Sequence, residues 1–557
     1  MRNNLDERGK DIFDLTLKLL NIKSVSNTKG VTEVGDFIYD YLNQLSYYQD
    51  NPEYLKKFPL ASDDSLGRNN IVALIKGEKA KNNKTIMYIS HMDTVDTGEY
   101  GDLEEYCCKP EKLMKKLSKR KLNSEVRTEL ESGEWLFGRG AADMKSGAAI
   151  EMQLIKEFSQ KVEEISGNVL IVITVNEEAD SLGMLNVAGP IAEMAEKEGL
   201  DFIGGINTDF VSQLAEDDYD NRYMFMGSLG KVVEAVYVVG KGSHVGQVFQ
   251  GFDVNLLLSK LTEKIDNNME LADNFKGMVT NPPVSLKQAD LKDEYNGQLP
   301  YQGFAYYNFL NYKRGTEEIV NVMKNKVEES FIESVEHINE QYRKYCNLAN
   351  EEYNAVELES RVFTYGELFE YVSNKYDPDT LKQELEIAHK KAREDTMDLR
   401  IHSLRIVQKL WNLSELAGPA AVVFLVPPYY PPHNPVIGDK KMKEFNDKIE
   451  TIIEEENKNA DSYNLVKKDF FPYLSDACFT VYQEGENDRK SLERNMPYWG
   501  RGWKINIDAV KKLNIPVIDM GVHGKDAHKF LERLHVPYAF NTLPTLVERA
   551  TFKLLED

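Results

Sequence analysis

The chain has 557 residues, which exceeds the length that a single hydrophobic core usually supports, so we expect two or more domains. Acidic residues outnumber basic ones by 91 to 68, and the formal net charge of -23 disfavours binding to nucleic acid or to an anionic membrane. The four cysteines include no CxxC pair, which excludes a disulfide framework and a cysteine-based zinc site and favours the reducing cytoplasm.

Helical and strand patterns alternate over residues 1–226. An amphipathic pattern predicts a helix at 8–20 and argues against a signal peptide, and no apolar run is long enough to predict a membrane span. Strands are predicted at 71–76, 86–90, 170–175 and 202–207. Since helical stretches separate these strands, we expect an α/β fold with a mostly parallel sheet and helices on both faces.

The sequence pattern changes near residue 226. The segment MGSLGKVVEAVYVVG begins with glycines, where we place a hinge and a domain boundary, and it continues as an alternating strand. A long charged helical stretch is predicted at 316–416. The following strand, AAVVFLVPPYYPP, is expected to stop at its prolines, because proline cannot continue a ladder of hydrogen bonds.

These boundaries predict one α/β domain interrupted by another. Residues 1–226 form its first part, and residues 436–557 return to helix–strand alternation and form its second part. The inserted domain covers 227–435 and carries the long helical extension.

Polar residues follow two of the predicted strands. His91 comes directly after the strand at 86–90, where ligands gather in open parallel sheets. Asp93 is placed to accept the other imidazole N–H and fix the tautomer of His91. Glu177 and Glu178 follow the strand at 170–175, and a cation would offset the repulsion between them and leave one free as a base. Taken alone, either pair also fits an ordinary polar loop.

Three further residues complete a candidate site. Asp143 lies in the glycine-rich segment GRGAADMKSG, where its carboxylate could bridge two cations or simply cap the next helix. Asp209 follows the fourth strand, and His528 follows the strand that ends at Asp519. Together, His91, Asp143, Glu178, Asp209 and His528 suit a pair of divalent ions, zinc first. Such a pair lowers the pKa of a bridging water and stabilises an oxyanion.

The motifs HMDTVD, GRGAADMKSG and NEEADSLG, the later aspartate and the His-x-x-x-Glu from His528 to Glu532 resemble the co-catalytic zinc peptidases and deacylases. That family includes carboxypeptidase G, tripeptidase T, acetylornithine deacetylase and succinyl-diaminopimelate desuccinylase. The resemblance implies a zinc exopeptidase-like fold with an inserted α+β lid and dimerisation domain. It also favours His528 over its neighbour His523 as a ligand, because only His528 has the three-residue spacing to Glu532.

The resemblance implies a role for each ligand. Asp143 would bridge both metals, with His91 and Asp209 completing one site. The other site would be completed by Glu178 and His528.

It also implies the roles of three other residues. Glu177 would be the general base that activates the bridging water, and Asp93 would orient His91. His244, in GKGSHVGQVFQ, is similar to the lid histidine that stabilises the oxyanion in the partner's site of related dimers. A homodimer through the lid domain is therefore expected.

The expected substrate is a small peptide or an N-acyl amino acid, so peptidase and deacylase activities both stay open. PPYYPP and GKDAHKFLERLHVPY are most similar to a protein of arginine utilisation, which implies a step in arginine or amino-acid catabolism. A non-catalytic metal-binding member of the family is the alternative. It would predict a damaged ligand set or a missing base, whereas this sequence has all five ligands and Glu177.

Overall fold

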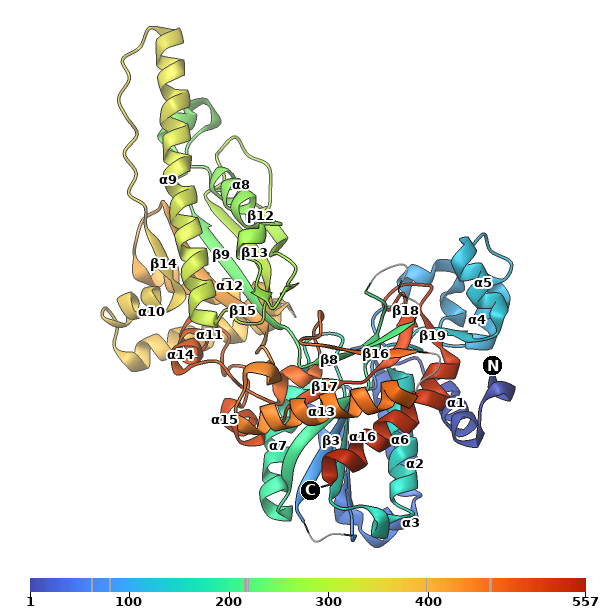
Figure 1. Ribbon diagram of the computed structural model, residues 1–557. Helices are drawn as coiled ribbons and strands as arrows, with labels where there is room; N and C mark the ends of the chain where they lie inside the picture. Colours follow the sequence, from blue (N-terminus) through green and yellow to red (C-terminus); the bar gives the residue numbers. More distant parts are fainter. Residues whose placement is uncertain are drawn as a thin grey trace. The chain divides into compact units, whose positions relative to one another are not determined.

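A computed structural model describes residues 1–61, 64–79, 82–214, 218, 220–396, 398–459 and 463–556. The chain divides into two compact units (Figure 1). The first contains Met1–Leu229, His433–Gln483 and Ile505–Asp557, and the second contains Gly230–Pro432 and Glu484–Lys504. The return of Glu484–Lys504 to the second unit is not among the boundaries predicted above. Glu484 belongs there because its carboxylate accepts hydrogen bonds from the backbone and the hydroxyl of Thr316.

The main sheet of the first unit has the strand order β1-β2-β5-β3-β6-β17-β8-β16. In that order, the strands are β1 (Leu55–Pro59), β2 (Asn69–Lys76), β5 (Asn168–Thr174), β3 (Lys84–His91), β6 (Asp201–Asn207), β17 (Val517–Asp519), β8 (Asn221–Met226) and β16 (Asn464–Lys468). The central strands β5, β3, β6 and β17 pair in parallel, and antiparallel pairings flank them. The expected α/β class is confirmed, with the parallel part at the centre of a mixed sheet.

Helices cover both faces of this sheet. One face carries α1 (Glu7–Leu20), α2 (Lys29–Asn43), α6 (Lys145–Phe158), α13 (Lys440–Asn459) and α16 (Leu543–Leu555). On the other, α7 (Leu182–Glu198) packs against β2 and α15 (Ile507–Leu513) packs against α7. The strand β5 reads NVLIVIT and is buried along its whole length. Side chains alternate between faces, so a strand covered on both sides is apolar along its interior, here Val169–Ile173.

Smaller elements complete the first unit. A second sheet has the order β4-β19-β18-β7, with β4 (Trp135–Phe137), β19 (Arg533–His535), β18 (Val522–Lys525) and β7 (Phe210–Val211). Residues 98–132 form η3 (Gly98–Tyr106), α4 (Pro110–Leu117) and α5 (Ser124–Ser132), which share a small apolar core. The short helix α3 (Ser46–Asp50) follows α2.

The second unit is built on a sheet of order β12-β13-β9-β15-β14. Its strands are β12 (Val284–Asp290), β13 (Gln302–Asn311), β9 (Gly230–Val239), β15 (Ala420–Tyr430) and β14 (Val362–Thr364), and a separate hairpin joins β10 (Asn274–Phe275) to β11 (Met278–Val279). The helices are α8 (Val254–Ile265), the long α9 (Thr316–Ala349), α10 (Tyr365–Ser373), α11 (Pro378–Asp395), α12 (Leu399–Ser414) and α14 (Glu486–Asn495) (Figure 1). Among the described residues, no helix has the length and apolar character that crossing a membrane requires.

One strand runs further than its sequence predicts. We expected the strand after 420 to stop at its prolines, but β15 continues through Pro427 and Pro428 to Tyr430. Its register against β9 shifts between Val426 and Tyr430. The two prolines therefore occupy an irregularity in the ladder, which is where a sheet tolerates residues without a backbone N–H.

Candidate metal centre

Four of the predicted site residues lie at the edge of the main sheet that is formed by the carboxyl ends of its parallel strands. His91 is the last residue of β3, Asp209 lies two residues beyond β6, and the pair Glu177–Glu178 follows β5. The strand β3 lies between β5 and β6 and is parallel to both. Because the carboxyl ends of these strands meet at the same edge, residues that are far apart in the chain converge there.

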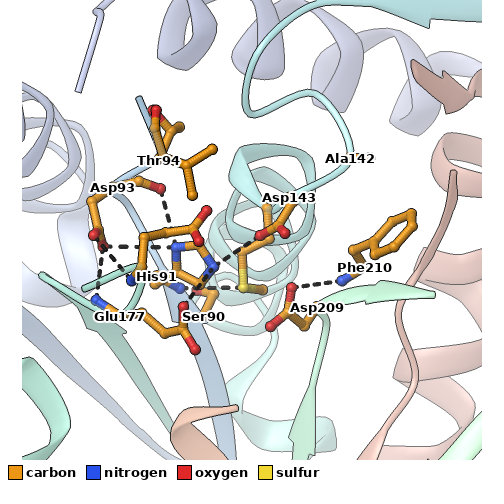
Figure 2. Close-up of polar contacts among 12 residues, drawn as sticks. Ser90, His91, Asp93, Thr94, Ala142, Asp143, Glu177, Asp209 and Phe210 are labelled. Carbon is orange, nitrogen blue, oxygen red and sulfur yellow. Dashed lines mark hydrogen bonds and ion pairs between the residues drawn. The ribbon is translucent and has the colours of Figure 1, made fainter. Parts of the chain in front are cut away.

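Among the described side chains, two groups can each hold a metal ion: His91, Asp143 and Asp209, and Asp143, Glu178 and His528. The candidate ligand atoms of each group lie within 4.8 Å of one another. Asp143 belongs to both. One of its oxygens lies 3.1 Å from Nε2 of His91 (Figure 2), and the other lies 3.0 Å from Nε2 of His528. The structure therefore brings all five predicted ligands together around one shared carboxylate.

The carboxylates of this centre fit a bound cation. Burial and the nearby Asp143 raise the pKa of Asp209 to about 7 and that of Glu178 to about 7. Oε1 of Glu178 is buried without a hydrogen-bond partner among the described residues. Buried acids and an orphaned oxygen are costly unless a positive charge offsets them. Together with two imidazoles, these oxygen ligands suit divalent ions such as zinc.

Glu177 lies beside the two groups and belongs to neither. Its Oε2 is 3.9 Å from Nε2 of His91, and its side chain is 12% exposed. Burial raises the pKa of Glu177 well above its ordinary value, and neighbouring acids add to this effect. A carboxyl group with a raised pKa next to a metal centre is suited to exchange protons near neutral pH.

Asp93 supports the centre from behind His91. Nδ1 of His91 lies 3.1 Å from the backbone carbonyl of Asp93 and 3.7 Å from its carboxylate, so the carbonyl is the nearer partner. The carboxylate of Asp93 accepts the backbone N–H groups of Glu177 at 3.2 Å and Glu178 at 3.3 Å. One residue therefore directs Nε2 of His91 toward the centre and anchors the loop that carries both glutamates.

Glu532 supports the turn that presents Asp143. Its Oε1 accepts the backbone N–H groups of Ala142 at 3.0 Å and Asp143 at 3.3 Å, and its Oε2 pairs with Arg139 at 2.7 Å. Both side chains of this ion pair are almost completely buried. The sequence identified Glu532 only through its spacing from His528, and no sequence pattern indicated its partner Arg139.

Two histidines near the C-terminus lie in different surroundings. His528 follows β18 with a φ of 64°, and its side chain is 54% exposed. His523 lies within β18, its ring 6.0 Å from that of Trp135 and 6.1 Å from that of His535. Burial lowers the pKa of His523 well below its ordinary value. Among the described residues, His523 joins neither group of candidate ligands.

His244 belongs to the second unit. It is exposed, and its Nδ1 accepts a hydrogen bond from the backbone N–H of Gly246 at 3.0 Å. Its part in catalysis stays a prediction from sequence.

Comparisons with known proteins place the chain in a family. A family model described as Peptidase family M20/M25/M40 matches residues 87–396. Protein RocB of Bacillus subtilis (strain 168) is 32% identical over 545 residues, which are 97% of this chain and 94% of RocB. The uncharacterised protein YqjN of the same organism is 29% identical over 98% of this chain and 96% of its own length. RocB is the relative that the segments PPYYPP and GKDAHKFLERLHVPY resemble, and this match confirms that resemblance.

Solved structures share the fold. An M20 family metallo-carboxypeptidase, Sso-CP2 from Sulfolobus solfataricus, aligns with a TM-score of 0.50 over 99% of this chain and 100% of its own. The sequence identity is 11%, so this likeness concerns the fold alone.

The geometry predicts an unusual titration of His528 in the metal-free protein. Its hydrogen bonds to Asp143 and Glu178 raise its pKa to about 11. The stabilising effect of the charged ring is fully present below the ordinary pKa of about 6.5 and is lost as the pH rises through the folded-state value. An NMR titration of the ring should show no deprotonation up to about pH 9. Asp143→Asn should lower this pKa, whereas the exposed-site control Asp50→Asn should not. A pKa near the ordinary value in the metal-free wild type would contradict the arrangement.

Proposed function

The chain belongs to the peptidase family M20/M25/M40, and from this membership we propose that it is a two-metal amide hydrolase acting on a small peptide or an N-acyl amino acid. A metal-dependent hydrolase is the general activity that the family supports. The observation that carries the proposal is the pair of ligand groups that share Asp143, with Glu177 next to them.

In this proposal, His91, Asp143 and Asp209 hold one ion, and Asp143, Glu178 and His528 hold the other. The mixture of imidazole and carboxylate ligands without sulfur favours zinc. When bound, such a pair of ions lowers the pKa of a water molecule and stabilises the negative charge that develops on the carbonyl oxygen.

Glu177 moves the proton in this proposal. Its carboxylate accepts a proton from the attacking water and then donates it to the nitrogen of the leaving amine. Its position outside both ligand groups supports this role, because its oxygens are not needed as ligands. Asp93 holds the backbone of Glu177 in place, so the base and the ligand Glu178 keep a fixed relation.

Two substitutions separate metal binding from proton transfer. Glu177→Gln should keep both ions and lower kcat by about 100-fold or more, because the amide cannot take up the proton. Asp143→Ala should bind fewer ions, since both groups lose the ligand that they share. Metal content per chain and kcat on the best substrate measure these effects, with the exposed-site variant Glu163→Gln as the control. Full activity in Glu177→Gln would show that another group is the base. A wild-type protein that binds fewer than two ions would contradict the two-metal proposal.

The proposal specifies the bond that is hydrolysed, which is an amide, and the two substrate classes that contain it. The resemblance to an arginine-utilisation protein supports a cytoplasmic step in arginine or amino-acid catabolism. A panel of dipeptides and N-acyl amino acids, each with arginine-containing members, distinguishes a peptidase from a deacylase by kcat/KM. We expect hydrolysis of at least one arginine-containing member. No hydrolysis of either class by protein carrying two ions would refute the proposal and favour a non-catalytic role.

We also propose a homodimer in which His244 stabilises the oxyanion in the partner's site. His244→Ala should then lower kcat by about 100-fold with little change in metal content, because it removes one stabilising donor. The exposed His337→Ala, in the same unit, is the matched control. Light scattering measures the oligomeric state of the active enzyme, and a fully active monomer would disprove this role.

A further inference from the structure

Glu151 is a buried acid that belongs to neither ligand group. It lies in α6, within the otherwise apolar stretch AAIEM, and it is 0% exposed. Its Oε2 accepts a hydrogen bond from Oγ of Ser90 at 2.7 Å, and its Oε1 accepts one from Oγ1 of Thr208 at 2.8 Å. Both hydroxyls are buried as well. Each oxygen of this carboxylate is therefore held by a different segment of the chain.

The two hydroxyls stand next to two candidate metal ligands. Ser90 precedes His91 at the end of β3, and Thr208 precedes Asp209 just after β6. These strands are parallel neighbours, and Ile89 lies opposite Asn207. Glu151 therefore connects the two strand ends one residue before the ligands that they carry.

The helix that carries Glu151 packs directly on both strand ends. A Cβ atom at Gly147 would lie 2.3 Å from the backbone oxygen of Thr208, so only glycine permits this approach. At the same helix end, the backbone N–H of His91 lies 3.4 Å from Sδ of Met144. Since Asp143 immediately precedes Met144, all three ligands of the first group are fixed against one helix.

The two ligands that belong to the second group alone, Glu178 and His528, lack this support. Glu178 lies on the loop after β5, and His528 is half-exposed on the loop after β18. Among the described residues, the side-chain hydrogen bonds of Glu151 reach only Ser90 and Thr208, which are not on those loops.

We propose that Glu151 is a positioning residue that sets the spacing between His91 and Asp209, and so the metal affinity of the His91–Asp143–Asp209 group alone. This inference rests on the proposed two-metal function. Residues that orient metal ligands from behind typically change metal affinity by about 10- to 100-fold when they are replaced.

The change in metal affinity can be measured in variants that keep only one of the two ligand groups intact. His528→Ala leaves only the first group able to bind an ion, and Asp209→Ala leaves only the second. Zn²⁺ affinity is measured in each background by competition with a chromophoric chelator. Adding Glu151→Leu should weaken binding about tenfold or more in the His528→Ala background and change it less than about twofold in the Asp209→Ala background.

Conservative variants test whether the loss of the two hydrogen bonds of Glu151 causes the weaker Zn²⁺ binding. Glu151→Gln should restore most of the affinity, because its amide oxygen accepts from one hydroxyl and its amide N–H donates to the other. Thr208→Val and Ser90→Ala each remove one of the two bonds and should each weaken Zn²⁺ binding by a smaller factor. These two variants decide the question if Glu151→Leu fails to fold. Gln153→Ala, at a buried position two residues further along α6, is the matched control.

Three results would overturn the inference. The first is that Glu151→Leu leaves Zn²⁺ affinity unchanged in the His528→Ala background. The second is that it weakens Zn²⁺ binding equally in both backgrounds, and the third is that Glu151→Gln does not restore the affinity. Where Glu151→Leu does not fold, unchanged affinity in both Thr208→Val and Ser90→Ala overturns it. Failure of the proposed function is a separate result, because the wild-type protein itself would then bind fewer than two Zn²⁺ ions.

Discussion

The carboxylate of Asp143 lies between two imidazole rings, with Nε2 of His91 at 3.1 Å from one oxygen and Nε2 of His528 at 3.0 Å from the other. Burial alone would raise the pKa of this acid, but its hydrogen bonds with the two histidines outweigh that effect and lower it. Both ligand groups need this side chain, so the geometry of the whole centre depends on where the backbone presents it.

Several parts of the first unit hold the backbone of Asp143 and the neighbouring loop after β5 in place. Glu532 accepts the N–H groups at Ala142 and Asp143, and the buried Arg139 balances its charge. Directly after the turn, α6 packs on the ends of β3 and β6 because Gly147 has no side chain. The carboxylate of Asp93 fixes the loop after β5. Glu532, Arg139 and Asp93 are buried polar groups with defined partners, which is what gives such groups a single position.

The second unit differs from the first in what it contributes to the candidate metal centre. Its sheet, β12-β13-β9-β15-β14, and its long helical segments contain no ligand of the centre among the described residues. All five candidate ligands and Glu177 thus belong to the first unit. Under the proposed function, the second unit supplies His244.

The sequence by itself determined the α/β class and the set of candidate ligands. Strand β5 is apolar from Val169 to Ile173 because both of its faces are buried, and His91, Glu178 and Asp209 lie at or just after the ends of strands that meet at one edge. Tertiary structure alone decided which buried polar groups support the turn of Asp143 and the ends of β3 and β6. Arg139 and Glu532 are 393 residues apart, and Glu151 and Ser90 are 61 apart, so no local period or spacing links them. The resemblance had favoured His528 over His523 by its spacing to Glu532, and folding supplies the physical difference, since it buries one ring beside Trp135 and leaves the other facing Asp143. A local sequence pattern indicates which side chains a segment buries. The partner of a buried polar group depends instead on which distant segment packs against it.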